Sequence, residues 1–194
     1  MKVAIVKYNA GNTASVANAL GRLGVTAEIT DDPERLASAE RVIFPGVGEA
    51  SSAMAYLKER KLDDVIRSLS QPVLGVCLGM QLLCASSEEN DTECLGLLPH
   101  KVRRFRSADL KIPHMGWNRI RDLCGPLFEN VGVGSHVYFV HGYCVESGEH
   151  TTAACDYGSS FSAALSYQNF HAVQFHAEKS GTVGERILEN FLNL

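Results

Sequence analysis

The first part of the chain alternates between short apolar runs and segments whose apolar residues recur at helical spacing. This pattern predicts four strands and four helices in strict alternation. Strands that alternate with helices form mostly parallel sheets covered by helices on both faces, so we expect an α/β fold with a mostly parallel central sheet flanked by helices. The predicted strands are residues 3–6, 25–29, 41–44 and 72–76. The predicted helices are 16–23, a short one from Asp32–Pro33, 54–69, and one that opens near Gly79.

The pattern changes after residue 95, where short β-type segments follow one another without helical spacing between them. The run over 137–175 predicts an antiparallel β extension that completes the same core, and the last predicted element is an amphipathic helix over 184–194. With no repeat or linker, we expect a single domain over 1–194. The predicted β segments are 102–105, 111–112, 138–140, 143–145, 151–155, 162–165 and 172–175.

Composition narrows the class of protein. The chain has 194 residues, 45% hydrophobic, with a formal net charge of -4. Plentiful apolar residues exclude disorder as the main description, and the longest nearly apolar run, 72–80, is too short to cross a bilayer. The start of the chain lacks the features of a signal peptide, so we expect a cytoplasmic protein. The mildly acidic balance gives no reason to expect a nucleic-acid or membrane partner.

Six cysteines occur without C-x-x-C spacing, which argues against a zinc ribbon, and we expect reduced thiols that mostly pack as small apolar residues. Cys77 differs, because Gly75 and Gly79 flank it with the spacing of a nucleophile elbow between a buried strand and a helix. Cys77 would also stand at the N-terminus of that helix, where the partial positive charge favours the thiolate over the thiol. The alternative is a buried structural cysteine beside packing glycines.

A thiol nucleophile needs a base, and His176 with Glu178 follows the last predicted strand. Residues two apart on extended chain share a side, so the Glu178 carboxylate can orient the His176 ring as the acid of a triad. The alternative is that His176 is an ordinary polar surface residue at the end of a strand. An H-x-E pair also occurs in zinc deaminases, but their P-C-x-x-C segment is absent, so we expect no metal.

A third candidate element is the segment Pro45-Gly46-Val47-Gly48 after the third strand. A thiolate that attacks an amide creates an oxyanion, which requires two N–H donors. The N–H groups of Leu78 and Val47 are the candidates. Taken alone, the segment also fits a plain turn that ends a strand.

Together these segments resemble the class I, or triad, glutamine amidotransferases, and the resemblance implies a flavodoxin-like α/β fold. The resemblance rests on residues 75–81, on 45–48 and on Gln174-Phe175-His176-Ala177-Glu178-Lys179-Ser180. Within that class, residues 113–118 (Pro-His-Met-Gly-Trp-Asn), 138–143 and 8–12 resemble the glutaminase subunits of imidazole glycerol phosphate synthase. The motifs run from one end of the chain to the other in the order of that family.

The resemblance implies that Cys77, His176 and Glu178 hydrolyse L-glutamine to glutamate and ammonia through a Cys77 thioester. It implies a heterodimer with a (β/α)8-barrel cyclase, which receives the ammonia and makes imidazole glycerol phosphate and AICAR in histidine biosynthesis, and it implies no cofactor. Low activity of the isolated chain is also expected. The residues implied to bind glutamine and its oxyanion are Gly46, Val47, Gly48, Leu78, Gln81, Glu89, His141, Gly142 and Tyr143. The residues implied to contact the partner are Trp117, Asn118, Tyr138 and Lys179.

Three positions depart from the family pattern. Lys7 stands where the family usually has Asp, Ala177 replaces a Pro, and Gly142 stands where Ser or Thr is frequent. None of these changes removes a reacting atom. The alternatives are another triad amidotransferase, serving vitamin B6 or a tetrapyrrole-type substrate, a DJ-1-like hydrolase or chaperone, and a regulatory binding domain with an inactive triad.

Overall fold

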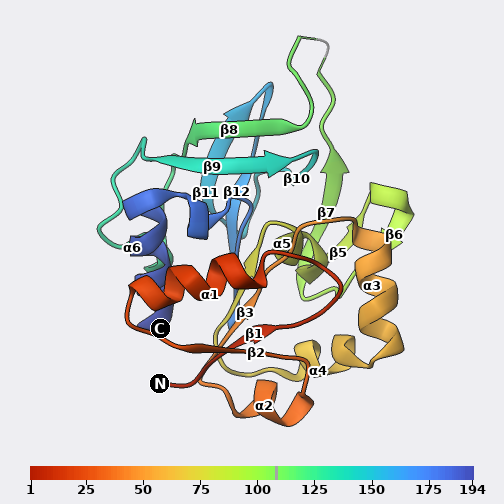
Figure 1. Cartoon of the computed structure of the whole chain (residues 1–194). Helices are drawn as coiled ribbons and strands as arrows, with labels where there is room; N and C mark the ends of the chain where they lie inside the picture. The colour runs from red at the N-terminus through yellow and green to blue at the C-terminus, as the bar shows by residue number, and fades with distance from the viewer. Residues whose placement is uncertain (108) are drawn as a thin grey trace.

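A computed structural model describes residues 1–107 and 109–194 and is built around a seven-stranded sheet in the order β11-β12-β13-β4-β3-β1-β2 (Figure 1). Five neighbouring strands run parallel, and the β12–β13 and β11–β12 pairs are antiparallel. The parallel strands are β1 (Val3–Val6), β2 (Ala27–Thr30), β3 (Arg41–Phe44), β4 (Val73–Val76) and β13 (Phe170–Val173). The antiparallel extension is β11 (Thr151–Tyr157) and β12 (Ser159–Tyr167). This confirms the predicted α/β class.

Helices cover both faces of the sheet, and each face has its own apolar cluster. Along β1, Val3 and Ile5 join one cluster while Ala4 and Val6 join the other, as alternating strand side chains require. The first cluster is closed by α1 (Thr13–Arg22) and α6 (Gly181–Leu192). The second is closed by α2 (Pro33–Ser38), α3 (Ala50–Glu59), α4 (Leu62–Ser68) and α5 (Leu78–Leu83).

Two smaller sheets lie beside the main one (Figure 1). One has the order β10-β7-β5-β6, and the other is the β8–β9 ribbon. Their strands are β5 (Cys84–Ser87), β6 (Thr92–Glu93), β7 (Leu98–Arg104), β8 (His114–Arg119), β9 (His136–His141) and β10 (Tyr143–Val145). Short 3-10 helices are η1 (Glu89–Asp91), η2 (Pro126–Phe128) and η3 (Ala177–Lys179).

Two predictions of secondary structure are wrong. The apolar face predicted as one helix over 54–69 belongs to α3 and α4, because Lys61 adopts a left-handed backbone (φ 56°) between them. Residues 111–112 form no strand, and the strand of that region is β8. The predicted start at Asp32 is confirmed, since its carboxylate accepts the N–H groups of Glu34 and Arg35.

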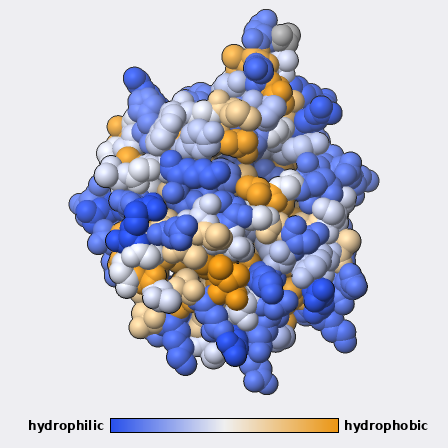
Figure 2. Space-filling model, in the orientation of Figure 1, coloured by the Kyte–Doolittle hydropathy of each residue, from blue (hydrophilic) through white to orange (hydrophobic). Residues whose placement is uncertain are grey.

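The parallel strands all finish at one edge of the main sheet. Loops that follow β1, β3, β4 and β13 therefore meet there, which is where open α/β sheets hold their ligands. On the face shown in Figure 2, apolar residues form small separate areas among polar ones. No helix within the described residues is long and apolar enough to cross a membrane.

Candidate active site

Cys77 lies in the tight turn between β4 and α5. Its backbone has φ 53° and ψ -107°, a conformation that side chains rarely adopt, and its N–H donates to the Val173 carbonyl at 2.8 Å. Such backbone strain costs on the order of 1–3 kcal/mol and persists only where the surroundings enforce it. The sheet hydrogen bond and the helix start fix the residue from both sides, so the thiol is held at the carboxyl edge of the sheet.

The two glycines of the motif are required by packing. A Cβ at Gly79 would lie 1.8 Å from the carbonyl oxygen of Phe44 in β3. A Cβ at Gly75 would lie 2.7 Å from Leu83 Cδ1 and 3.0 Å from the Met80 backbone nitrogen. Glycine at both positions therefore leaves the room that the tight turn at Cys77 needs.

His176 and Glu178 follow β13 and form a buried pair. His176 Nδ1 and Glu178 Oε1 are 2.8 Å apart, and both side chains are 1% exposed. Burial alone would lower the pKa of His176, but hydrogen bonds and charge interactions with Cys77 and Glu178 outweigh it and raise the pKa to about 9. Burial likewise opposes ionisation of Glu178, yet contact with His176 lowers the pKa of its carboxyl. The pair therefore keeps a proton close to the Cys77 sulfur.

Cys77 and His176 line one cavity of about 320 Å³, a size that suits a small molecule. All the residues implied by sequence to bind glutamine also line it, except Gly46. The remaining wall residues are Pro113, Val140 and Lys179.

The segment 45–48 lies beside Cys77 but does not leave both expected oxyanion donors free. The Leu78 N–H donates to the Gly46 carbonyl at 3.2 Å. Tyr8 holds the same segment, because its buried hydroxyl donates to the Pro45 carbonyl at 2.6 Å. An oxyanion can use the Leu78 N–H only after the Gly46 carbonyl turns away.

Gln81 and Glu89 both present oxygen atoms to the cavity. Gln81 Nε2 donates to the Tyr143 carbonyl at 3.2 Å and to Gln174 Oε1 at 3.0 Å. Its nitrogen is therefore occupied, and its carbonyl oxygen is the atom left for a ligand. Glu89 Oε2 accepts the Ala50 N–H at 2.8 Å, and partial burial raises the pKa of its carboxyl. Both side chains offer acceptors, which suits a bound ammonium group.

Two buried histidines connect the β8–β9 ribbon to the cavity wall. His141 Nδ1 lies 2.8 Å from the Tyr143 carbonyl, and its Nε2 lies 3.0 Å from His114 Nδ1. A carbonyl only accepts, so His141 donates through Nδ1 and must accept from His114 through Nε2. His114 Nε2 in turn faces Asn118 Nδ2 at 3.3 Å. Each ring is thus neutral and held in one tautomer.

This pair leads us to expect that acid weakens the fold. Burial lowers the pKa of His114 to about 4 and of His141 to about 3, whereas unfolded histidine titrates near 6.5. The unfolded chain therefore binds more protons as the pH falls below about 6.5, and the free energy of unfolding decreases down to about pH 4. Urea unfolding across this range measures the slope. A flat profile in the parent chain would contradict the buried pair.

The residues expected at the partner contact divide into two groups. Trp117 is 56% exposed, its ring packs against Tyr138 with centroids 5.9 Å apart, and Lys179 is exposed at the cavity rim.

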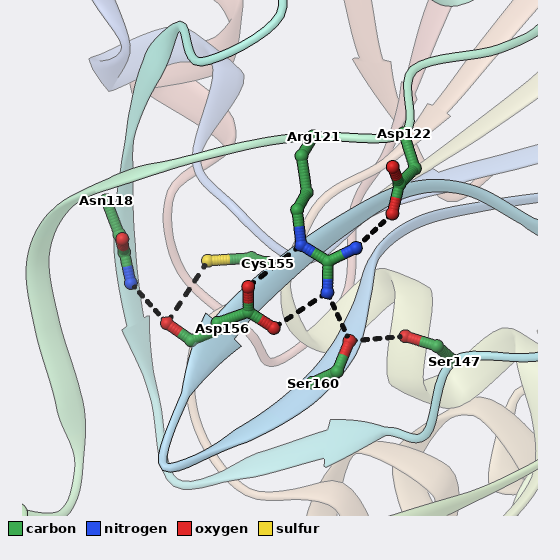
Figure 3. Close-up of polar contacts among 7 residues, drawn as sticks. All are labelled: Asn118, Arg121, Asp122, Ser147, Cys155, Asp156 and Ser160. Atoms are coloured by element: carbon green, nitrogen blue, oxygen red, sulfur yellow. Dashed lines mark hydrogen bonds and ion pairs between the residues drawn. The ribbon is translucent and has the colours of Figure 1, made fainter.

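Asn118 instead donates to the Asp156 carbonyl at 3.0 Å. Figure 3 shows this contact beside Arg121, whose guanidinium binds the Asp156 carboxylate, Asp122 and Ser160.

Sequence reasoning gave no role to two residues that touch the triad. Gln174 is fully buried, and its Nε2 lies 3.7 Å from the Cys77 sulfur. Asn12 Nδ2 lies 2.5 Å from Glu178 Oε1. They belong to the segments 8–12 and 174–180, which resemble the family, but a local sequence pattern does not tell which residue of a segment reaches a distant side chain.

The remaining cysteines are free thiols in the described chain. Cys84, Cys94, Cys144 and Cys155 are buried, and burial raises the pKa of each thiol, to about 11 for Cys94 and about 12 for Cys144 and Cys155. The expectation that most cysteines pack as apolar residues is confirmed, with exposed Cys124 as the exception. Within residues 1–107 and 109–194, no group of three or more His, Cys, Asp or Glu side chains could hold a metal ion.

A family model described as "Glutamine amidotransferase class-I" matches residues 4–194. The chain belongs to the class I glutamine amidotransferases. This amidotransferase is 55% identical to the imidazole glycerol phosphate synthase subunit HisH of Bacteroides fragilis, with all of both chains aligned. The protein of the same name from Shewanella loihica is 46% identical, over 98% of this chain and 89% of the relative. That from Haemophilus influenzae is 45% identical, over 99% and 97%.

Solved structures support the fold of the amidotransferase. A crystal structure of a glutamine amidotransferase superposes with a TM-score of 0.77 at 22% identity, covering 100% of this chain and 98% of the other. The structure of PurLQS from Thermotoga maritima gives a TM-score of 0.74 at 16% identity, covering 99% and 97%. The predicted fold, a mostly parallel sheet with an antiparallel part, is thus confirmed.

Proposed function

We propose that this chain is the glutaminase subunit of an imidazole glycerol phosphate synthase and acts in histidine biosynthesis. It hydrolyses L-glutamine to glutamate and ammonia and passes the ammonia to a cyclase subunit. The full-length similarity to HisH proteins supports this function. The observation that carries the chemistry is that Cys77 and His176 line one cavity, with Glu178 hydrogen-bonded behind the histidine.

The reaction follows from the order of these three side chains. The Cys77 sulfur, whose proton His176 holds, attacks the side-chain amide carbon of glutamine, and His176 gives that proton to the departing nitrogen. Ammonia leaves, and a thioester joins the glutamyl group to Cys77. A water molecule, deprotonated by His176, then attacks the thioester carbon and releases glutamate. Glu178 keeps the His176 ring oriented and stabilises its protonated form.

The α-ammonium and α-carboxylate groups of glutamine carry opposite charges and so need different partners. The acceptors of Gln81 and Glu89 suit the α-ammonium group, whose arrival would stabilise the ionised Glu89 carboxyl. The backbone of residues 141–143 and the segment 46–48 line the rest of the bound molecule. The N–H groups of Leu78 and Val47 stabilise the oxyanion, once the Leu78 N–H has been released from Gly46.

The partner in this proposal is a (β/α)8-barrel cyclase that forms a heterodimer with the chain. Ammonia in neutral water is mostly protonated and unreactive, so it must pass through a sealed interface. The exposed Trp117, Tyr138 beside it and Lys179 at the cavity rim suit such a contact, since large aromatic side chains are frequent interface anchors. Free buried thiols suit a reducing cytoplasm.

A comparison of turnover with and without the partner tests this function. The isolated chain should hydrolyse glutamine slowly, because the Leu78 N–H is occupied. Adding the cyclase and its nucleotide substrate should raise glutamate release about 100-fold, the usual effect of one oxyanion donor. Imidazole glycerol phosphate should form only in the mixture. Absence of glutamine hydrolysis in every combination would contradict the proposal, and equal turnover with and without the cyclase would contradict the account of the occupied donor.

A further inference from the structure

We propose that Asn12 is a positioning residue of this site, whose side-chain amide holds the Glu178 carboxylate in place behind His176. The inference rests on the proposed function and assigns a role to a segment, residues 8–12, that the triad alone leaves unexplained. Asn12 is not among the residues that line the cavity, and its side chain binds behind the histidine. Its effect on the reaction must therefore pass through Glu178 and His176.

Two donors converge on one carboxylate oxygen. Glu178 Oε1 accepts from Asn12 Nδ2 at 2.5 Å and from His176 Nδ1 at 2.8 Å. Asn12 Nδ2 also lies 3.4 Å from His176 Nδ1. Both nitrogens carry hydrogen when they bind the carboxylate, so they are neighbours on the same oxygen rather than partners of each other.

The rest of the carboxylate has little other support. Glu178 Oε2 is buried and has no hydrogen-bond partner among the described residues. A buried carboxylate without enough donors tends to protonate, because burial penalises the charged form. The contacts with His176, and after them the Asn12 hydrogen bond, lower the pKa of Glu178 against that tendency. Loss of Asn12 would leave His176 as the remaining side-chain donor.

The backbone at Asn12 is set up for this contact. Asn12 directly precedes α1 and has φ 82°, a left-handed conformation that asparagine tolerates better than most residues. Asparagine at this position usually caps the helix with its side chain, but Asn12 makes no cap hydrogen bond. The side chain instead donates a hydrogen bond to Glu178, which lies 166 positions later in the sequence.

The surrounding loop is anchored independently of Glu178. Tyr8 donates to the Pro45 carbonyl, and Asn9 Nδ2 donates to the Ser52 carbonyl at 3.2 Å. A change at Asn12 can therefore remove the contact with Glu178 while these anchors remain. Asn9 offers a matched control, because it is an asparagine of the same loop whose side chain binds away from the triad.

The test uses the complete complex with its cyclase and compares Asn12→Ala, Asn12→Asp and Asn9→Ala. Asn12→Ala should lower kcat for glutamine hydrolysis about 10- to 100-fold, because a freed carboxylate lets the ring drift from its productive position. KM for glutamine should change little, since Asn12 does not line the cavity. Asn9→Ala should keep the parental kcat.

Asn12→Asp should give kcat a pH dependence that a merely structural role of Asn12 would not produce. A protonated Asp side chain can donate to Glu178 as the amide does, whereas an ionised one repels it. The ratio of variant to parental kcat should therefore fall as the pH rises. Parental kcat in Asn12→Ala, a loss matched by Asn9→Ala, or a ratio that does not change with pH would overturn the inference. Failure of the parental complex to release ammonia would instead overturn the proposed function.

Discussion

Replacing Cys77 by Ala should abolish ammonia release from glutamine while leaving the fold intact. Alanine keeps the small volume of the side chain in a site that is nearly buried, so packing changes little. It removes the only atom that can form the thioester, and loss of a covalent nucleophile lowers turnover on the order of 10⁵-fold or more. Glutamate release by the complex with the cyclase measures the loss.

Cys124 provides the matched control for this change. It is an exposed free cysteine, and it is absent from the cavity wall. Cys124→Ala should retain full turnover. If Cys77→Ala kept more than about a hundredth of the parental rate, the covalent mechanism would be wrong, because positioning and oxyanion contacts alone give far smaller rate enhancements.

Replacing Gly79 by Ala should strongly destabilise the fold. The added Cβ would stand 1.8 Å from the Phe44 carbonyl oxygen. The Cβ is fixed directly to the helix backbone and the oxygen belongs to the backbone of β3, so rotation of a side chain cannot relieve the contact. Relief requires that α5 move away from β3, which disturbs the turn at Cys77. Overpacking of this severity costs about 3 kcal/mol or more of unfolding free energy. Chemical denaturation measures it.

Gly21 is the control for the Gly79 substitution. It lies in α1 with an ordinary backbone, and a Cβ there would meet nothing within 4 Å. Gly21→Ala should stabilise the chain by about 0.5–1 kcal/mol, because alanine loses less freedom than glycine on entering a helix. Equal behaviour of the two variants would show that the close approach at Gly79 does not govern the elbow.

The local sequence pattern is sufficient to predict the elements that depend on a run of consecutive residues. β1 and β3 match their predicted bounds, since a buried parallel strand is a continuous apolar run. β8 was missed because its outward side chains, Met115 and Trp117, are themselves apolar, which hides the usual alternation. The break at Lys61 has no glycine or proline to announce it.

The candidate site likewise combines local features, which can be predicted from the sequence, with long-range contacts, which cannot. The elbow around Cys77 and the spacing of His176 from Glu178 are local features, so the sequence pattern predicts them directly. The occupied Leu78 N–H and the amide of Asn12 depend on contacts between distant segments, which no local spacing encodes. The prediction that Gln81 and Glu89 bind glutamine rests on family resemblance, because their local sequence has no pattern that separates them from surface residues.

Mass spectrometry of the complex, quenched with acid during glutamine turnover, tests the central claim most directly. The account expects a γ-glutamyl thioester on the peptide that carries Cys77, on no other cysteine, and none in Cys77→Ala. Turnover of glutamine with no glutamyl group on Cys77 at any quench time, or with the group on another residue, would contradict it.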